Sequence, residues 1–362
     1  MLDKILNKKI EYIWVFTAIF VSTLSILIVA YQGAVAIDRE TEINENFIVK
    51  QAKAQTETTL IFGGDVMLAR TVEQKILAAN DYSLPFQKIA DEFKEADLTF
   101  INLESPFFDG GSATPNGSVV FRALSETIEG LKLAGIDIVS LANNHFGNQG
   151  VAGEKFTFEH LTNNEIEYCG AGNNFEQAHE SKIIAVKGIK IGFFAYAYPE
   201  SLYVATENSP GVANMEIDQM KKDLTQLNNS ADIIIVSMHA GAEYTHNPGR
   251  FQINFAHTAI EAGADLVVGH HPHVVQTTEK YNDGYIIYSL GNLVFDQMWS
   301  EETQQGAVVK AIISENKLKS LEFKPVHIYD YNQPDWASQE ESKEILSNMG
   351  LEEATVILSR KP

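Results

Sequence analysis

Three histidines occur in the short stretch GHHPHVVQ, residues 269–276, which directly follows the apolar run ADLVV. His271 and His273 occupy alternate positions, so in an extended chain both side chains point to the same face. Removing two imidazoles from water is costly unless they share a partner, and imidazole is a common ligand of zinc and related ions. The pair therefore predicts a metal site at the end of a buried strand.

Polar side chains also end five other apolar runs. They are Asp65 after TLIFGG, Asn102 and Glu104 after ADLTF, Asn143, Asn144 and His145 after IDIVSLA, His239 at the end of ADIIIVSMH, and Asn292 after YIIYSLG. Because ligands of open α/β sheets sit outside the carboxyl ends of the strands, these residues can converge although they lie far apart in the chain. Carboxylate, imidazole and amide donors together suit Zn, Mn, Fe or Ni better than Ca or Mg, which prefer oxygen alone.

The elements that must position these residues alternate along the chain. Helices are expected at 71–79, 84–94, 125–134, 153–163, 217–227 and 250–262, between the apolar runs. The alternation of strand and helix predicts an α/β domain whose helices cover the faces of a sheet. Near the end, GAVVKAIISENKLKSLEFKPVHIYD predicts antiparallel strands around a Glu-Asn turn.

Composition limits the class of protein. The 362 residues are 45% apolar, which is enough for a large packed core, and the formal net charge is −21. Proteins that bind a phosphate backbone usually carry a basic surface, whereas this chain is strongly acidic. No nucleic-acid partner is therefore expected. An anionic substrate would have to meet local positive charge, such as a metal ion or an arginine. Cys169 is the single cysteine, which excludes an internal disulfide and any CxxC motif.

The N-terminal part predicts a membrane anchor. Residues 12–31 carry no charge and are about as long as a helix that crosses a bilayer. Lysines precede this run and acidic residues follow it, which predicts a cytoplasmic tail (1–11), a single-pass anchor in the cell membrane and an extracytoplasmic main domain. The alternative is a signal peptide cleaved after the stretch AVA, residues 34–36.

The rest of the chain divides by composition and pattern. Residues 32–58 are polar without clear periodicity and are interpreted as a linker. The main domain is expected at 59–330, and 331–362 is expected to be a peripheral C-terminal tail.

Six blocks of the main domain, in chain order, resemble those of a known family. The blocks are GGDVMLAR, INLESP, LANNH, MHAGAEY, GHHPHVVQ and YSLGNLVFD. They resemble the poly-γ-glutamate capsule synthesis family called CapA or PgsA, which is similar in turn to the calcineurin-like metallophosphoesterases. The resemblance implies a four-layer αββα sandwich with a two-metal centre, and an exported, membrane-anchored protein of capsule polymer synthesis, export or processing.

The resemblance also implies roles for individual residues. The implied metal ligands are Asp65, Glu104 as a bridging carboxylate, Asn144, His239, His271 and His273. His145 resembles the histidine that protonates a leaving oxygen. His270 is left as a spare donor or as support for the ligands, and Asn292 is a candidate for the same supporting role or a simple turn residue. The implied cofactors are two divalent metal ions, Mn, Zn or Fe.

Substrate binding is predicted from charge and position. Arg70 can offer a bidentate fork to a phosphate or carboxylate, although an ordinary salt bridge would explain it equally well. Arg122, Glu243 and Tyr244 are weaker candidates for the same cleft.

The chain departs from the family pattern at three positions. Met67 stands in place of a ligand histidine, Asn148 in place of an aspartate after the NNH block, and Ala240 in place of a tryptophan. The last change predicts a roomier or altered pocket wall.

Two functions remain open. The first is a metal-dependent hydrolase or transferase, acting on a phosphoester or on an amide or ester of an acidic polymer at the outer membrane face. The second is a non-catalytic subunit that binds the polymer or scaffolds a membrane synthase or export complex. The complete set of metal-type donors favours the first function, whereas Met67 and Asn148 favour the second.

Overall fold

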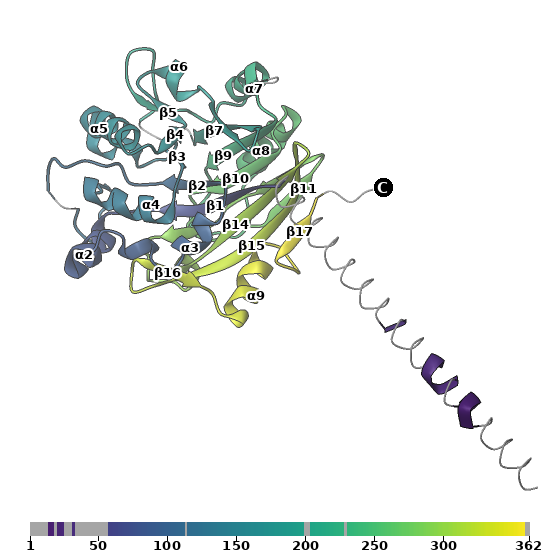
Figure 1. Cartoon of the computed structure of the whole chain (residues 1–362). Helices are drawn as coiled ribbons and strands as arrows, with labels where there is room; N and C mark the ends of the chain where they lie inside the picture. Colours follow the sequence, from purple (N-terminus) through teal and green to yellow (C-terminus); the bar gives the residue numbers. More distant parts are fainter. Residues whose placement is uncertain are drawn as a thin grey trace, which may run out of the picture. The chain divides into compact units, whose positions relative to one another are not determined.

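The computed structural model describes residues 14–17, 20–24, 31–32, 57–112, 114–198, 203–227 and 230–358 (Figure 1). Of the predicted anchor, 12–31, residues 14–17, 20–24 and 31 are helical, and its other residues lie outside the described part, as do the tail 1–11 and most of the linker. A helix long and apolar enough to cross a membrane is not found among the described residues. Residues from Thr58 onward form one compact unit.

The larger of two sheets in this unit has nine strands within the described residues. They are β1 (Thr58–Val66), β2 (Leu98–Leu103), β3 (Ile138–Ser140), β4 (Glu167–Cys169), β13 (Asn292–Val294), β14 (Gln305–Ser314), β15 (Lys317–Tyr329), β16 (Gln333–Trp336) and β17 (Thr355–Ile357). The main path runs β16-β15-β14-β1-β2-β3-β4, while β13 pairs with β1 and β17 with β15. Strands β1 to β4 are parallel, so their carboxyl ends meet at one edge.

The smaller sheet has six strands in the same described part, in the order β11-β12-β10-β9-β7-β6. They are β6 (Lys182–Val186), β7 (Ile189–Ala197), β9 (Ile233–His239), β10 (Leu266–His270), β11 (Thr278–Tyr281) and β12 (Gly284–Ile287). Here β7, β9, β10 and β12 are parallel. The short strands β5 (Ala171–Gly172) and β8 (Gly211–Val212) pair separately.

The helices mostly follow the predicted amphipathic segments. They are α2 (Arg70–Ala79), α3 (Ala90–Lys94), α4 (Ile128–Ala134), α5 (Gly150–Asn163), α6 (Phe175–Ala178), α7 (Ile217–Leu227), α8 (Arg250–Glu261) and α9 (Gln339–Asn348), with 3₁₀ turns η1 (Leu84–Phe86), η2 (Ser125–Thr127), η3 (Phe146–Gln149) and η4 (Glu302–Gln304). The helix predicted over 84–94 is wrong as one element, because η1 and α3 are separate and bury Phe86 and Phe93 one after the other.

The two sheets pack face to face, and helices cover their outer faces (Figure 1). Phe100 of β2 stacks on Phe193 of β7 across the interface, with ring centroids 5.7 Å apart. The next residue of β7, Phe194, points outward, as the twofold period of a strand requires, and joins a second apolar cluster with Phe255 of α8. On the larger sheet, Phe93 of α3 packs into the core. The predicted α/β sandwich is confirmed, and its layers run helix, sheet, sheet, helix.

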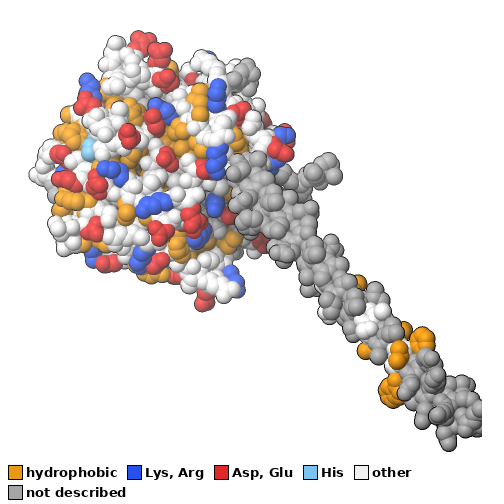
Figure 2. All heavy atoms as spheres, in the orientation of Figure 1, with side chains coloured by type: hydrophobic (Ala, Val, Ile, Leu, Met, Phe, Trp, Pro, Cys, Tyr) orange, Lys and Arg blue, Asp and Glu red, His pale blue; other side chains and the backbone are white. Residues whose placement is uncertain are grey.

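The last part of the compact unit extends the larger sheet. Strands β14 and β15 form the predicted hairpin, with Glu315 and Asn316 in the left-handed conformation at φ 53° and 54°. Residues after Tyr331, expected to be a peripheral tail, add β16 and β17 to the edge of this sheet, and α9 buries Ile345 against it. On the face of the unit shown in Figure 2, acidic and basic side chains are interspersed.

Candidate metal centre

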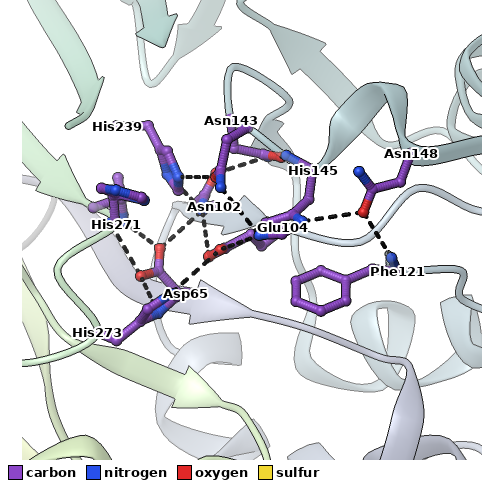
Figure 3. A network of polar contacts seen from close by, with 12 residues as sticks. Asp65, Asn102, Glu104, Phe121, Asn143, His145, Asn148, His239, His271 and His273 are labelled. Carbon is purple, nitrogen blue, oxygen red and sulfur yellow. Dashed lines mark hydrogen bonds and ion pairs between the residues drawn. The ribbon is translucent and has the colours of Figure 1, made fainter. Parts of the chain in front are cut away.

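Strand register brings polar side chains of both sheets to the same end of the sandwich. In the larger sheet Asp65 of β1 pairs in register with Asn102 of β2 and with Asn292 of β13. In the smaller sheet His239 of β9 stands beside His270 of β10. Figure 3 shows that Asp65, Glu104, His239, His271 and His273 point toward one another. The convergence that the sequence predicts is present.

Two glycines let the strands come close enough for this. A Cβ on Gly64, directly before Asp65, would overlap with the carbonyl oxygen of Gly291, to which Asp65 N donates over 3.0 Å. A Cβ on Gly269, directly before His270, would overlap with the carbonyl of Tyr288. Both positions therefore require glycine for the close approach of a neighbouring backbone.

Asn102 connects the two sheets at the centre of the site. Its amide Nδ2 donates to Asp65 Oδ1 over 2.8 Å and lies 3.3 Å from His239 Nδ1. Because an amide nitrogen can only donate, Nδ1 of His239 accepts, and the ring proton of the neutral imidazole is on Nε2. From there it is donated to Asn144 Oδ1 over 2.8 Å. The sequence places Asn102 at a strand end within the INLESP block, and that position is the signal for this central role.

His145 is held on both ring nitrogens. Asn144 Nδ2 lies 3.1 Å from His145 Nε2, so Nε2 accepts, and Nδ1 carries the proton and donates to Asn148 Oδ1 over 3.0 Å. Phe121 stacks on the imidazole at a centroid distance of 3.9 Å, and its backbone N–H also donates to Asn148. The amide that replaces the family's aspartate thus keeps the hydrogen bond to His145 and lacks the charge.

His273 is oriented by Asn292. His273 Nδ1 lies 3.0 Å from Asn292 Oδ1 and donates to it, which leaves the unprotonated Nε2 facing Glu104 Oε1 at 3.7 Å. Asn292 is fixed in turn by donating to the Thr303 carbonyl over 2.9 Å. His271 and His273 both have positive φ, at 95° and 59°, an uncommon conformation that concentrates at functional sites.

Several buried polar atoms near Glu104 and His273 have no hydrogen-bond partner. Glu104 Oε1 is one of them, and besides His273 it faces Nε2 of His145 at 3.8 Å. Others are His271 Nδ1 and both ring nitrogens of His270, which is fully buried with Nδ1 3.4 Å from Asp65 Oδ1. Lone pairs that face one another in a dry site repel, and a shared proton or a cation between them relieves that repulsion.

The charges of the site are strongly perturbed. Burial, and then the charge of Asp65, raises the pKa of Glu104 well above its usual range. Burial would raise the pKa of Asp65 too, but the imidazoles of His270 and His273, 3.4 and 3.5 Å from its carboxylate oxygens, prevail and hold it well below the usual range. Burial lowers the pKa of His145 to about 3 and that of His271 to about 4. Both histidines are therefore neutral at pH 7, which is the form that binds a metal.

The donor set fits divalent cations. Within the described residues, two groups of three have ligand atoms within 4.8 Å of one another, Asp65 with Glu104 and His239, and Glu243 with His271 and His273. Carboxylate oxygen and imidazole nitrogen are ligands of zinc and related ions. Met67 is fully buried and its Sδ faces the backbone N–H of Ala69 at 3.1 Å. His270 is the nearby side chain whose unpartnered nitrogens can act as a spare donor.

Of the predicted substrate-binding residues, Arg70 and Arg122 are already paired. Arg70 forms an ion pair with Asp296, donates to the Ser118 carbonyl over 2.9 Å and lies over the ring of Phe121. The ring of Phe121, which stacks on His145, is therefore the contact that Arg70 and His145 share. Arg122 is buried and pairs with Glu73 at 3.2 Å, so the structure does not bring it to the centre.

Glu243 and Tyr244 do lie at the centre. Glu243 belongs to the second donor group, and the ring of Tyr244 is 6.2 Å from that of His273. Ala240 is fully buried in the apolar cluster beneath α7 and α8, whereas Gly241 and Ala242 line the neighbouring pocket. Ala240 itself does not line the pocket, and the roomier or altered pocket wall expected from the absence of a tryptophan there stays a prediction.

The fold and the site define an α/β sandwich protein with a candidate metal centre between its two sheets, and the comparisons with known proteins supply the family. The family profile described as "Bacterial capsule synthesis protein PGA_cap" matches residues 59–297. Capsule biosynthesis protein CapA of Bacillus anthracis is 31% identical over 282 residues, which are 75% of this chain and 68% of that protein. PGA biosynthesis protein CapA of Bacillus subtilis (strain 168) is 30% identical over 272 residues, 74% of this chain and 71% of that protein.

The chain belongs to the PGA_cap family of bacterial capsule synthesis proteins. The resemblance stated from the sequence blocks is confirmed. Among solved structures, a 5'-nucleotidase precursor from Thermus thermophilus is similar with a TM-score of 0.46 and 12% identity, over 80% of this chain and 58% of that one.

Proposed function

We propose that this chain is a metal-dependent hydrolase or transferase of capsule polymer synthesis, export or processing. Its substrate would be a phosphoester or an amide or ester of an acidic polymer of the poly-γ-glutamate type. The observation that carries the proposal is the buried Glu104 Oε1, which has no hydrogen-bond donor and faces the unprotonated Nε2 atoms of His273 and His145 at 3.7 and 3.8 Å. A cation between these atoms would relieve the repulsion of their lone pairs and would favour the charged form of Glu104.

The residues present suit two divalent cations, Mn, Zn or Fe, held by Asp65, Glu104, Asn144, His239, His271 and His273. When bound, such ions supply Lewis acidity and lower the pKa of a water molecule toward neutrality. The contribution of His145 is to hold or move a proton at Nε2, the ring nitrogen that faces Glu104. Asn148 keeps the ring in the orientation that this requires. Because neutral His145 has no proton on Nε2, it would first accept one there before it could donate to a leaving group.

The same proposal includes a place in the cell. The described residues of the predicted anchor are helical and expose Trp14, Phe16 and Phe20, which supports a membrane-anchored chain with its main domain outside. Membrane lipid and synthase or export subunits would then be its partners. Fractionation of full-length protein tests this. An integral anchor resists alkaline carbonate extraction, whereas a mature chain that begins near residue 37 would establish a cleaved signal peptide.

The metal content of the purified full-length protein is the first test of the centre. We expect elemental analysis to find divalent metal and the protein to cleave bis-p-nitrophenyl phosphate in a metal-dependent reaction. The cleavage should be lost in both His239→Ala and His145→Ala. His239→Ala should also lose metal, whereas His145→Ala should retain it. A protein without bound metal and without turnover would remove the enzyme proposal.

The alternative is a non-catalytic subunit that binds the polymer or scaffolds a membrane complex. Two observations favour it, namely Met67 in place of a ligand histidine and the uncharged Asn148 beside His145. Metal retained without turnover on the phosphodiester or on the polymer would support this alternative.

A further inference from the structure

A pocket of about 620 Å³ adjoins the candidate metal centre. Asn144, His239 and His271 form one of its walls, so the pocket opens directly on the donor set. The first turn of α8, including Arg250 and Phe251, lines the same pocket. A substrate group bound in this pocket would therefore lie next to a substrate bond placed at the candidate metal centre.

Arg250 is the feature of this pocket that the sequence did not indicate. Its side chain is exposed, and it forms no hydrogen bond or ion pair within the described residues. The two other arginines in that part of the chain behave differently, since Arg70 pairs with Asp296 and Arg122 with Glu73. Arg250 thus offers an unused guanidinium fork, which matches the geometry of a carboxylate.

The backbone around Arg250 adds to the same preference. α8 has twelve residues, its N-cap is Gly249 without a side-chain cap, and its first turn contains no acidic residue. The N–H of Gly249 is satisfied by Gln252, and the positive end of the helix dipole at this turn favours a bound anion. Gln252 is held by Gly249 N at 2.8 Å and by Gln276 at 2.9 Å, which fixes this turn against the pocket.

The remaining walls limit what can enter. Tyr198 and Phe251 meet edge to face with ring centroids 5.0 Å apart and give the pocket an aromatic side. Glu243 also lines the pocket, so the positive charge of Arg250 is opposed by one negative charge. This balance favours a group with a single negative charge over a doubly charged phosphate.

We propose that this pocket binds a carboxylate side group of the substrate through Arg250, next to the bond that is cleaved or transferred at the centre. The inference rests on the proposed function and deepens it, because it assigns a carboxylate-bearing polymer rather than a simple phosphoester to the site. Arg250 is a positioning residue in this scheme, since it holds the substrate and takes no part in the bond change.

Binding of short γ-linked glutamate oligomers to the purified full-length protein tests the proposal. The measurement is made by calorimetry in the presence of a chelator, so that no metal ion can hold the carboxylates. We expect saturable binding by the wild type and about tenfold to hundredfold weaker binding by Arg250→Gln, which is the loss of one charge-assisted pair. Arg250→Lys should recover part of the affinity. Lys222→Gln, which removes an exposed charge from α7, should bind as the wild type does.

A neutral analogue separates carboxylate recognition from mere contact. An oligomer of the same length with amide groups in place of the free carboxylates should bind the wild type and Arg250→Gln equally weakly. The proposal is overturned if the wild type does not bind, if Arg250→Gln binds the acidic oligomer normally, or if inorganic phosphate binds through Arg250 more tightly than the oligomer. Because no turnover is measured, the binding result does not depend on the enzyme proposal, which is tested separately by metal content and phosphodiester cleavage.

Discussion

His145 Nδ1 lies 3.0 Å from Asn148 Oδ1, so an uncharged amide orients the histidine that faces the buried Glu104 (Figure 3). A carboxylate in the same place would also orient the ring, and it would in addition favour the imidazolium ion. An aspartate at this position, as in the family pattern, would supply both the hydrogen bond and a charge, whereas Asn148 supplies the hydrogen bond alone.

Replacing Asn148 by Asp should raise the pKa of His145 from about 3 by about one to three units, because an opposite charge would then lie next to the ring. NMR titration of the ring in metal-free protein measures the change. Asn208→Asp adds the same charge at an exposed position outside the site and serves as the control. An unchanged His145 titration in Asn148→Asp would show that the hydrogen bond seen here does not control the ring.

The buried carboxylate Glu104 should affect stability in opposite directions with and without metal. Glu104→Gln removes a buried ionisable group whose charged form burial and Asp65 disfavour, and it should stabilise the metal-free protein at neutral pH by about 1 to 2 kcal/mol. The same change should abolish the rise in unfolding temperature that Mn or Zn produces in the wild type, since that rise reports binding to the folded state. Thermal unfolding with and without each metal measures both effects, and Glu344→Gln on the exposed face of α9 is the control. Equal metal stabilisation of Glu104→Gln and the wild type would exclude Glu104 as a ligand.

Glu154 in α5 provides a pH prediction away from the centre. It is 3% exposed, its Oε2 has no hydrogen-bond partner, and burial raises its pKa to about 7. The folded protein therefore holds a proton that the unfolded chain releases near its lower, ordinary pKa, so stability should fall as pH rises from about 4.5 to 7. Glu154→Gln should remove this slope, leaving stability near pH 4.5 unchanged and increasing it at pH 8 by about 1 to 2 kcal/mol. Urea unfolding of both proteins at pH 4.5 and pH 8 measures this effect. An equal difference in stability between Glu154→Gln and the wild type at the two pH values would contradict the prediction.

Close approach at Gly64 should make this position intolerant of a side chain. Gly64→Ala places a methyl group against the Gly291 carbonyl and should destabilise the protein by about 3 kcal/mol or more, with loss of any bound metal because Asp65 is displaced. Gly249→Ala is the matched control, since its new Cβ would meet nothing closer than 3.7 Å and should cost less than about 1 kcal/mol. Denaturant unfolding and metal analysis of the two variants check the contrast.

Strand ends were the part of this protein most accessible from sequence. Asp65 and His239 could be placed because each ends a continuous apolar run, and parallel strands bring such ends to one edge. The pairing of Arg122 with Glu73 could not be predicted. Arg122 lies in the loop before η2 and Glu73 lies in α2, and no local pattern in the sequence indicates that these two segments are in contact. Arg250 was missed for a related reason. It begins an ordinary amphipathic helix, and only the packing of α8 beside β9 turns that helix start into a pocket wall.

Asp65 and Glu104 come from the larger sheet, whereas His239, His271 and His273 come from the smaller one. The donor group of Asp65, Glu104 and His239 therefore spans both sheets, and an ion can be held by all three residues only after the two sheets have docked. A loaded centre would then cross-link them and report that folding is complete.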